Sequence, residues 1–423
     1  MSDASQSTGT TSTEGIDTRL LAFVQSMIGE YLPYEKLLAR AESLGLDGQE
    51  AWRLITYARR VTGFPRLPLD GERTVSGDSF WTMPPVIFEA IEVISSRASA
   101  ASHLWSVIKP LVHRRQFLQP IVEDIATAAV RDGFSIGYEE ARRIIVDGAT
   151  PCTNTETIIA RTWEVMRHIP PEGALWHADD FARALHHITS DASELPDTAA
   201  SAVSPITWLL DRDNHPHDDE LLESSQLWGT HPLFNLLMQS EMLWSQQHFP
   251  ACNTLLEVAA RTSSARAMGL PLLQLVPLSQ LRFNWEHGIA SGALPDFPYG
   301  RAVLMTEFGT DCTPSLLQDV SMIVASLDGL ERTARAMERT LTEANERIGA
   351  DFRLNHRQQD LLRSLLANPA LAMDVETYRR RFDVALTTAR DDLNRLVALQ
   401  WCTTAYEGKR QIFWLSPAAD PLR

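Results

Sequence analysis

The chain has 423 residues, 44% hydrophobic and 22% charged, an ordinary globular composition that is long enough for two or three domains. It carries 54 acidic residues against 38 basic ones, which gives a formal net charge of −16. Because a uniformly acidic protein repels nucleic acid, DNA contact is excluded except through a local basic surface. The four cysteines are widely spaced and no apolar run reaches the length of a membrane span, which is typical of a protein in a reducing, cytoplasmic compartment.

The N-terminal part is predicted to be a short tail followed by helices. Residues 1–15 are rich in Ser, Thr and Gly and lack the basic and apolar regions of a signal peptide, so we expect a disordered tail. Residues 16–110 form the next predicted region, where apolar positions recur at helical spacing. The Gly- and Pro-rich stretch 63–85 within it indicates loops or short strands.

Residues 111–315 are predicted to form a helical core with a small β element. A short apolar piece, 206–210, precedes a polar turn that contains His215, His217, Asp218 and Asp219. This pattern indicates a strand or hairpin with a solvated turn rather than a metal site. The chain contains no P-loop, no GxSxG and no HExxH motif, so we expect neither a metal nor a cofactor.

The clearest periodicity in the chain predicts one long helix over 316–350. Apolar residues alternate there in steps of four and three, which is the seam of a heptad repeat: Leu316, Val320, Ile323, Leu327, Leu330, Ala334, Met337, Leu341, Ala344 and Ile348. Two interpretations stay open, a long helix packed on its own domain or a homodimer through 316–348.

Residues 351–423 are predicted to form a winged helix-turn-helix. Asn355 is expected to cap a helix from His356 to Leu366, and Asp374 a second helix from Val375 to Phe382. A third helix starts at Thr387 or Thr388 and ends near Leu399, and two β-rich pieces, 401–404 and 411–414, flank a turn. Three helices followed by a two-stranded wing is the layout of that DNA-binding fold.

The charge of this C-terminal part supports contact with DNA. Residues 353–411 hold ten Lys or Arg against seven Asp or Glu, so subtracting this +3 from −16 leaves about −19 for the rest of the chain. The third helix and the wing tip supply the residues expected to contact DNA: Thr387, Thr388, Arg390, Asn394, Arg395, Lys409 and Arg410. Asp391 and Asp392 on the same helix weigh against this interpretation, since a winged helix that contacts only proteins is the alternative.

The order of short segments along the chain resembles that of the larger bacterial Fic proteins. No single segment is strong evidence for the resemblance, but the order and spacing that the segments share are strong evidence. They are Trp52 with Arg59-Arg60, Pro68-Leu69, Pro84-Pro85, Glu140 to Arg143, Gly148, Thr155-Glu156, Leu185 to Ile188, His231-Pro232, Gly269-Leu270, Ser279, LNHRQQDLL and TARDDLNRL. The resemblance implies a mainly α fold, with a Fic-like helical core, a small β flap and the C-terminal winged helix. It also implies an activity, the transfer of AMP to protein hydroxyl groups.

The defining motif of that family is overwritten in this chain. The family pattern is His-Pro-Phe-x-Asp/Glu-Gly-Asn-Gly-Arg-x-x-Arg, in which the His is the base, the acid holds Mg²⁺ and the turn and arginines bind phosphate. In the register fixed by His231-Pro232 upstream and Gly269 downstream, the motif positions read Gln247, Ala251, Cys252, Asn253, Thr254, Leu255 and Val258. A register shifted by one would place His248 at the base position and still supply no acid and no arginine. We therefore expect no AMP transfer by the family mechanism.

The family's inhibitory helix is altered as well. Its motif is Ser/Thr-x-x-x-Glu-Gly/Asn, and its glutamate pairs with the second motif arginine. This chain has Asp132-Gly133 at that place, and the position of the partner arginine holds Val258. The resemblance thus implies that the inhibitory contact was lost together with the catalytic groups.

These observations predict a catalytically inactive Fic-like pseudoenzyme that acts in transcription regulation through its winged helix. We expect DNA as its partner, with a protein partner at the Fic-like cleft as a further expectation. Two alternatives remain, a divergent protein adenylyltransferase and a protein-interaction partner in a toxin–antitoxin or defence system.

Overall fold

The computed structural model describes most of the chain. The described residues are 17–32, 34–65, 80–112, 114–168, 175–176, 178–190, 231–245, 249, 251–289, 304–306, 309–368 and 371–421. Internal contacts divide the chain into two compact units. The first takes the ranges Met1–Ile91, Asp213–Thr230 and Leu294–Ser321, and the second takes Glu92–Arg212, His231–Ala293 and Met322–Arg423.

The first unit begins with the three helices α1 (Thr18–Met27), α2 (Tyr34–Ser43) and α3 (Gly48–Thr62). The prediction of helices in this region is therefore confirmed. Buried Arg59 of α3 donates hydrogen bonds of 2.9–3.1 Å to carbonyl oxygens at and just beyond the end of α1, those of Met27, Ile28 and Glu30. These carbonyls have no partner within their helix, so the arginine ties α3 to α1.

A small sheet in the first unit joins segments that are distant in the sequence. Its strand order is β1 (Phe64–Pro65), β2 (Phe80–Trp81), β4 (Gly309–Asp311) and β3 (Leu304–Thr306), with β2 parallel to β4 and the other pairs antiparallel. The piece predicted as a strand or hairpin, 206–210, and the turn after it lie outside the described residues.

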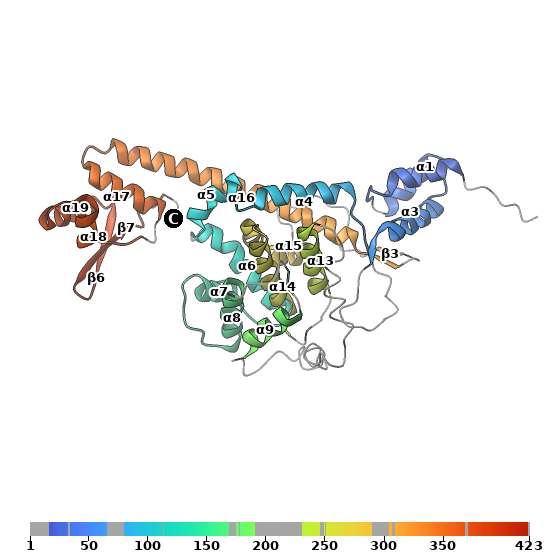
Figure 1. Cartoon of the computed structure of the whole chain (residues 1–423), viewed down its shortest axis with the longest axis horizontal. Helices are drawn as coiled ribbons and strands as arrows, with labels where there is room; N and C mark the ends of the chain where they lie inside the picture. Colours follow the sequence, from blue (N-terminus) through green and yellow to red (C-terminus); the bar gives the residue numbers. More distant parts are fainter. Residues whose placement is uncertain are drawn as a thin grey trace, which may run out of the picture. The chain divides into compact units, whose positions relative to one another are not determined.

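The second unit contains the helical core. Its helices are α4 (Pro85–Ala98), which begins in the first unit, then α5 (His103–Ile108), η1 (Lys109–Leu111), α6 (Arg115–Arg131), α7 (Tyr138–Ile145), α8 (Asn154–His168), α9 (Ala178–Thr189), α13 (Pro232–Ser245), α14 (Asn253–Ala267), η3 (Pro271–Leu275) and α15 (Leu278–Glu286). Figure 1 shows α14 among α6, α13 and α15, and every residue from Asn253 to Ala265 is buried. The mainly α fold class is confirmed.

Charged side chains in the middle of this core satisfy one another. Glu257 of α14, fully buried, accepts hydrogen bonds from Ser240 of α13, from Arg261 Nε at 2.8 Å and from Ser279 Oγ at 3.1 Å. Arg261 also binds Asp124 of α6 at 2.6 Å, and Asp124 accepts the Ser279 N–H at the start of α15. Burial alone would raise the pKa of Glu257, but Arg261 and Arg282 outweigh it and lower that pKa. The network therefore fixes α6, α13, α14 and α15 against one another.

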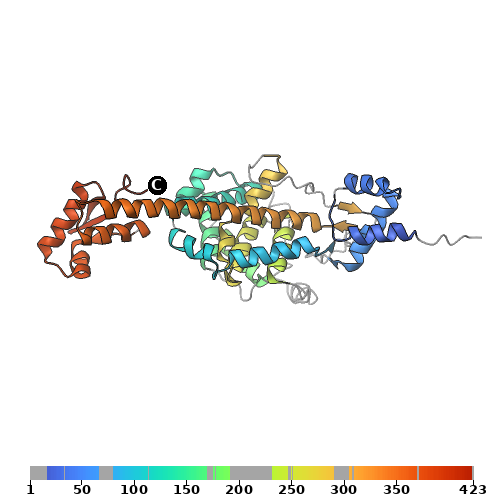
Figure 2. The same cartoon turned by 90° about the horizontal axis from the view of Figure 1, so that it is seen from above.

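The heptad-patterned segment forms one helix, α16 (Thr313–Ala350). All ten residues of the predicted seam except Leu341, which is partly buried, are buried within the chain itself. Figure 2 shows α4 running beside α16, and Arg97 of α4 binds Asp328 at 2.7 Å and Glu331 at 2.9 Å on α16. The observed packing is that of the first interpretation, a helix packed on its own chain.

The C-terminal module, residues 351–421, has the elements that the sequence predicted. Helices α17 (His356–Ala367), α18 (Val375–Phe382) and α19 (Leu386–Ala398) precede the hairpin of β6 (Cys402–Glu407) and β7 (Arg410–Leu415), and the expected caps Asn355 and Asp374 are confirmed. The sequence analysis missed β5 (Met373–Asp374), which pairs with β7 and completes a sheet of order β5-β7-β6. The module core also includes Ala344 and Ile348 of α16.

None of the helices within the described ranges combines the length and the apolar character that crossing a bilayer requires.

Replacing Glu257 tests the buried network. We expect Glu257→Ala to lower the free energy of unfolding by about 3–5 kcal/mol, because Arg261 and Arg282 would be left as buried charges without their shared partner. Chemical denaturation followed by circular dichroism measures the change. The matched control is Glu139→Ala, which breaks an exposed pair with Arg142 and should cost less than about 1 kcal/mol. Equal costs for the two variants would contradict a central role of the network.

Candidate functional site

The overwritten motif lies at the start of α14. Cys252, the residue before the helix, has a left-handed backbone with φ of 61° and supplies no side-chain cap. Glycine adopts this conformation without strain, and the resemblance places a glycine here. The retained Asn253 accepts a hydrogen bond from Phe249 N at 2.8 Å and donates one to Phe249 O at 2.7 Å. Asn253 therefore holds the turn that leads into the helix.

The carboxylate of Asp132 caps this helix from outside. Asp132 follows the last turn of α6, and its two oxygens accept the N–H groups of Thr254 and Leu255, each at 2.9 Å. These are two of the donors that a helix start leaves without an internal partner. We call these two N–H groups together with Asp132 the α14 cap. A protein carboxylate thus occupies the place where the family pattern directs backbone donors at a phosphate.

This contact was not foreseen from the sequence. The family pattern pairs the inhibitory side chain with an arginine side chain, and with Val258 at that position we expected Asp132 to have lost its role. The structure gives Asp132 backbone partners instead. Burial raises the pKa of Asp132 to about 6, and the hydrogen bonds from Thr254 and Leu255 limit the rise.

The other replaced positions are part of the hydrophobic core. Leu255 and Val258 are fully buried, and Ala251 is 8% exposed. Gln247, at the position of the family's base, lies outside the described residues, as does His248. The thiol of Cys252 is buried as well, and its pKa is raised by that burial and by nearby Asp132, so it has no thiolate character at neutral pH.

Two arginines near the α14 cap are engaged with acidic groups. Arg131 donates to Glu286 at 2.6 Å and to the Trp244 carbonyl at 3.1 Å, with its guanidinium 4.0 Å from the centre of the Trp244 ring. Arg282 donates to Glu257 at 3.5 Å. The charge of both is therefore already balanced within the core. In the part of the chain that the structure describes, no three His, Cys, Asp or Glu side chains could together hold a metal ion.

The second candidate site is the outer face of the C-terminal module. On α19, Thr387, Arg390, Asn394 and Arg395 are exposed and Thr388 is half-buried, at the spacing of one helix face. Lys409 and Arg410 are exposed at the tip of the hairpin, where Gly408 takes a left-handed φ of 61°. Among the described side chains, Arg390, Arg395 and Lys409 form no ion pair. The residues singled out from the sequence thus lie at the surface, on two neighbouring elements of the module.

One acidic residue of α19 belongs to the interior rather than to this face. Asp392 is 7% exposed and accepts hydrogen bonds from Asn355 at 2.6 Å, from Arg357 Nε at 2.9 Å and from Tyr378 at 3.2 Å. It holds α19 against α17 and α18, and its charge is compensated by Arg357. The expectation that Asp392 opposes DNA contact is therefore corrected, whereas Asp391 is exposed and does oppose it.

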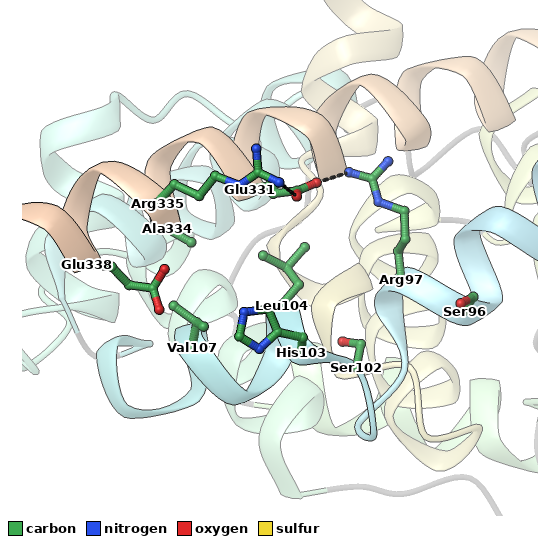
Figure 3. Close-up of a pocket in the computed structure, with 10 residues that line it drawn as sticks. All are labelled: Ser96, Arg97, Ser102, His103, Leu104, Val107, Glu331, Ala334, Arg335 and Glu338. Carbon is green, nitrogen blue, oxygen red and sulfur yellow. Dashed lines mark hydrogen bonds and ion pairs between the residues drawn. The ribbon is translucent and has the colours of Figure 1, made fainter.

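A separate groove lies between α5 and α16 and shares no residue with the α14 cap. It encloses about 370 Å³. Figure 3 shows Leu104 and Val107 of α5 at its apolar base, with Arg97, Arg335 and Glu331 along the opposite side. Glu331 binds both arginines, so the charges on that side are paired within the groove.

Comparison with known proteins gives similarity to solved structures. No protein-family profile matches the chain, and no curated protein does. The structure is similar to the crystal structure of a Fic family protein from Desulfovibrio desulfuricans G20, with a TM-score of 0.44 and 15% sequence identity over 79% of this chain and 97% of that one.

The raised pKa of Asp132 predicts a pH-dependent contribution to stability. Its carboxyl binds a proton more tightly in the folded chain, at a pKa of about 6, than at the ordinary value of 3.8, so its contribution is greatest below pH 4 and declines as the pH rises to about 6. We expect Asp132→Ala to lower the free energy of unfolding at both pH values, and by about 2 kcal/mol more at pH 4.5 than at pH 7.5. Urea denaturation at these two pH values measures the difference.

The control for this experiment is Asp147→Ala, which removes an exposed carboxylate of the same charge, paired with Arg142. Its cost should stay below about 1 kcal/mol at either pH. A cost of Asp132→Ala that is the same at pH 4.5 and pH 7.5 would show that Asp132 has an ordinary pKa in the folded chain.

Proposed function

We propose that this chain is a catalytically inactive Fic-like protein that regulates transcription by binding DNA through the C-terminal module. The observation that carries the inactive half is the α14 cap, and the one that carries the DNA-binding half is the exposed face of Thr387, Arg390, Asn394 and Arg395 beside the hairpin tip.

The α14 cap supports loss of the nucleotide reaction for an electrostatic reason. A triphosphate at the start of α14 would meet the carboxylate of Asp132 at the same N–H donors. The family's two arginine positions hold buried Leu255 and Val258, and Arg131 is bound to Glu286. Several negative charges would therefore enter a partly dehydrated place without compensation, which strongly opposes binding.

The distribution of charge in the C-terminal module supports DNA as the partner. Arg357 is neutralised by Asp392, Arg379 by Glu376 and Arg381 by Asp360, so these pairs add little to the surface potential. Four other cations, Arg390, Arg395, Lys409 and Arg410, lie on α19 and at the hairpin tip. Arginine and asparagine on one helix face are the side chains that read guanine and adenine in the major groove.

A homodimer through 316–348 remains part of the proposal in altered form. The seam itself is buried within the chain, so a dimer would have to use the exposed side of α16. A protein partner at the Fic-like cleft and a cytoplasmic location are proposed from the sequence alone.

Mutations on the two elements should weaken DNA binding in different ways. Lys409→Ala together with Arg410→Ala should weaken binding to all duplexes alike and lower the slope of log K against log salt by about one per lost phosphate contact. Arg390→Ala should cost about 1–3 kcal/mol on a selected site and much less on random duplex. Fluorescence anisotropy over a range of salt concentrations, after selection of preferred sites from a random library, measures both effects.

The control variant is Arg40→Ala, which removes an exposed cation of α2 that is paired with Glu30 and distant in sequence from the module. It should leave the affinity and the salt slope unchanged. Absence of duplex binding by the wild-type chain at low salt, or an equal loss with the control variant, would refute the DNA-binding proposal.

The rival function is nucleotide transfer by a divergent mechanism. We expect no label on any protein when the purified chain, Mg²⁺ and a cell lysate are incubated with ATP or another nucleotide labelled at the α-phosphate. Loss of both base and metal site removes orders of magnitude of rate, since base catalysis alone contributes about 10²–10⁴-fold. Labelling by the wild-type chain that Gln247→Ala abolishes would establish the enzyme instead.

A further inference from the structure

Arg114, just before α6, contacts the C-terminal module with its buried side chain. Its Nη1 donates to both carboxylate oxygens of Asp420, at 2.9 and 3.0 Å, and its Nη2 donates to the carbonyl of Leu366 at 3.0 Å. Arg114 is 8% exposed.

Both acceptors suit a cation. The Leu366 carbonyl lies in the last turn of α17, where carbonyls lack a partner within the helix and the helix dipole favours positive charge. Asp420 is held in a turn after β7, in which its own N–H donates to the Ser416 carbonyl at 3.1 Å. Arg114 thus binds the end of one helix and the tail of the module at the same time.

The contact combines a charge pair shielded from water with one buried donor that has no partner. A charge pair that is shielded from water is more strongly attractive than an exposed one. Against this, the Nε of Arg114 is buried without a hydrogen-bond partner in the described structure, and that unpaired donor costs free energy. The closed state therefore carries a penalty that is relieved when water reaches the arginine.

We infer that Arg114 and Asp420 form a latch that restrains the C-terminal module on the helical core and lowers its affinity for DNA. The functional consequence rests on the proposed DNA binding. The rest of the chain carries about −19 charges against +3 in the module, so a module held on the core stays close to a strongly acidic body. Opening the latch leaves the module joined to that body through α16 alone, and it can then approach phosphates with less repulsion.

The test uses Asp420→Ala in the full chain, because Asp420 is not among the hydrophobic core residues of the module. Hydrogen exchange followed by mass spectrometry should show faster exchange in 416–421 and in the last turn of α17. Affinity for a random DNA duplex should rise about 2–10-fold at 0.01 M salt, where charges act over about 30 Å, and the gain should shrink at 0.15 M, where they act over about 8 Å.

A second variant, Arg114→Ala, and the double variant separate a latch from two independent effects. Arg114→Ala removes the bonds to both Asp420 and Leu366, so if the two side chains act as one contact, the double variant should match Arg114→Ala in both exchange and affinity. The matched control is Asp328→Ala, which breaks the partly exposed pair with Arg97 between α4 and α16 and should leave the exchange of 416–421 unchanged.

Unchanged exchange in Asp420→Ala overturns the latch, and so does faster exchange without a rise in affinity in a chain that binds DNA. If the wild-type chain and Asp420→Ala both bind no DNA, the proposed function fails, and the latch is then judged by exchange and by the double variant alone.

Discussion

The core depends on a helix that is buried along almost its whole length and yet carries charge. Glu257 and Arg261 of α14 can remain ionised there because Asp124, Ser240 and Ser279 come from three different elements to satisfy them. Any slide or rotation of α14 would separate buried charges from their partners. The position of its first turn is therefore fixed as firmly as that of its middle, and so is the direction in which its free N–H groups point.

The first N–H groups of α14 have no acceptor within the helix. Because the helix cannot move, the acceptor that satisfies them must lie at a fixed place. In the family that the sequence resembles, the motif supplies a turn, a metal-binding acid and arginines for a nucleotide phosphate. Here the partner is Asp132 from the end of α6, and the former arginine positions contribute apolar volume as Leu255 and Val258. An internal anion at this helix start and apolar residues at Leu255 and Val258 are consistent with one another, because the carboxylate already satisfies the N–H groups. Cys252 adopts a left-handed backbone, which costs free energy in a residue other than glycine.

Sequence reasoning placed the elements whose signals are local. Asn355 and Asp374 indicate helix starts because their side chains cap the first turn, and the apolar seam of α16 repeats over ten positions. It missed β5 and the four-stranded sheet, since strands of two or three residues are too short to show alternation and are held by partners far along the chain. It placed Asp392 at the surface, because the three residues that bind it inside come from other helices. The new role of Asp132 could not be read from side-chain identities, because its partners are backbone groups.

The same distinction between local and distant signals governs the charge of the C-terminal module. The module's net charge of +3 counts all cations alike, but Arg357, Arg379 and Arg381 form ion pairs with acidic residues of the module itself. Arg390, Arg395, Lys409 and Arg410 lie on α19 and the hairpin beside the acids Asp391 and Glu407, so the outer face is net basic by two charges. An acidic body joined to such a face repels the ligand that the face attracts. Under the DNA-binding proposal, the attachment of the module through α16 and through Arg114 would influence affinity together with the residues that contact the DNA.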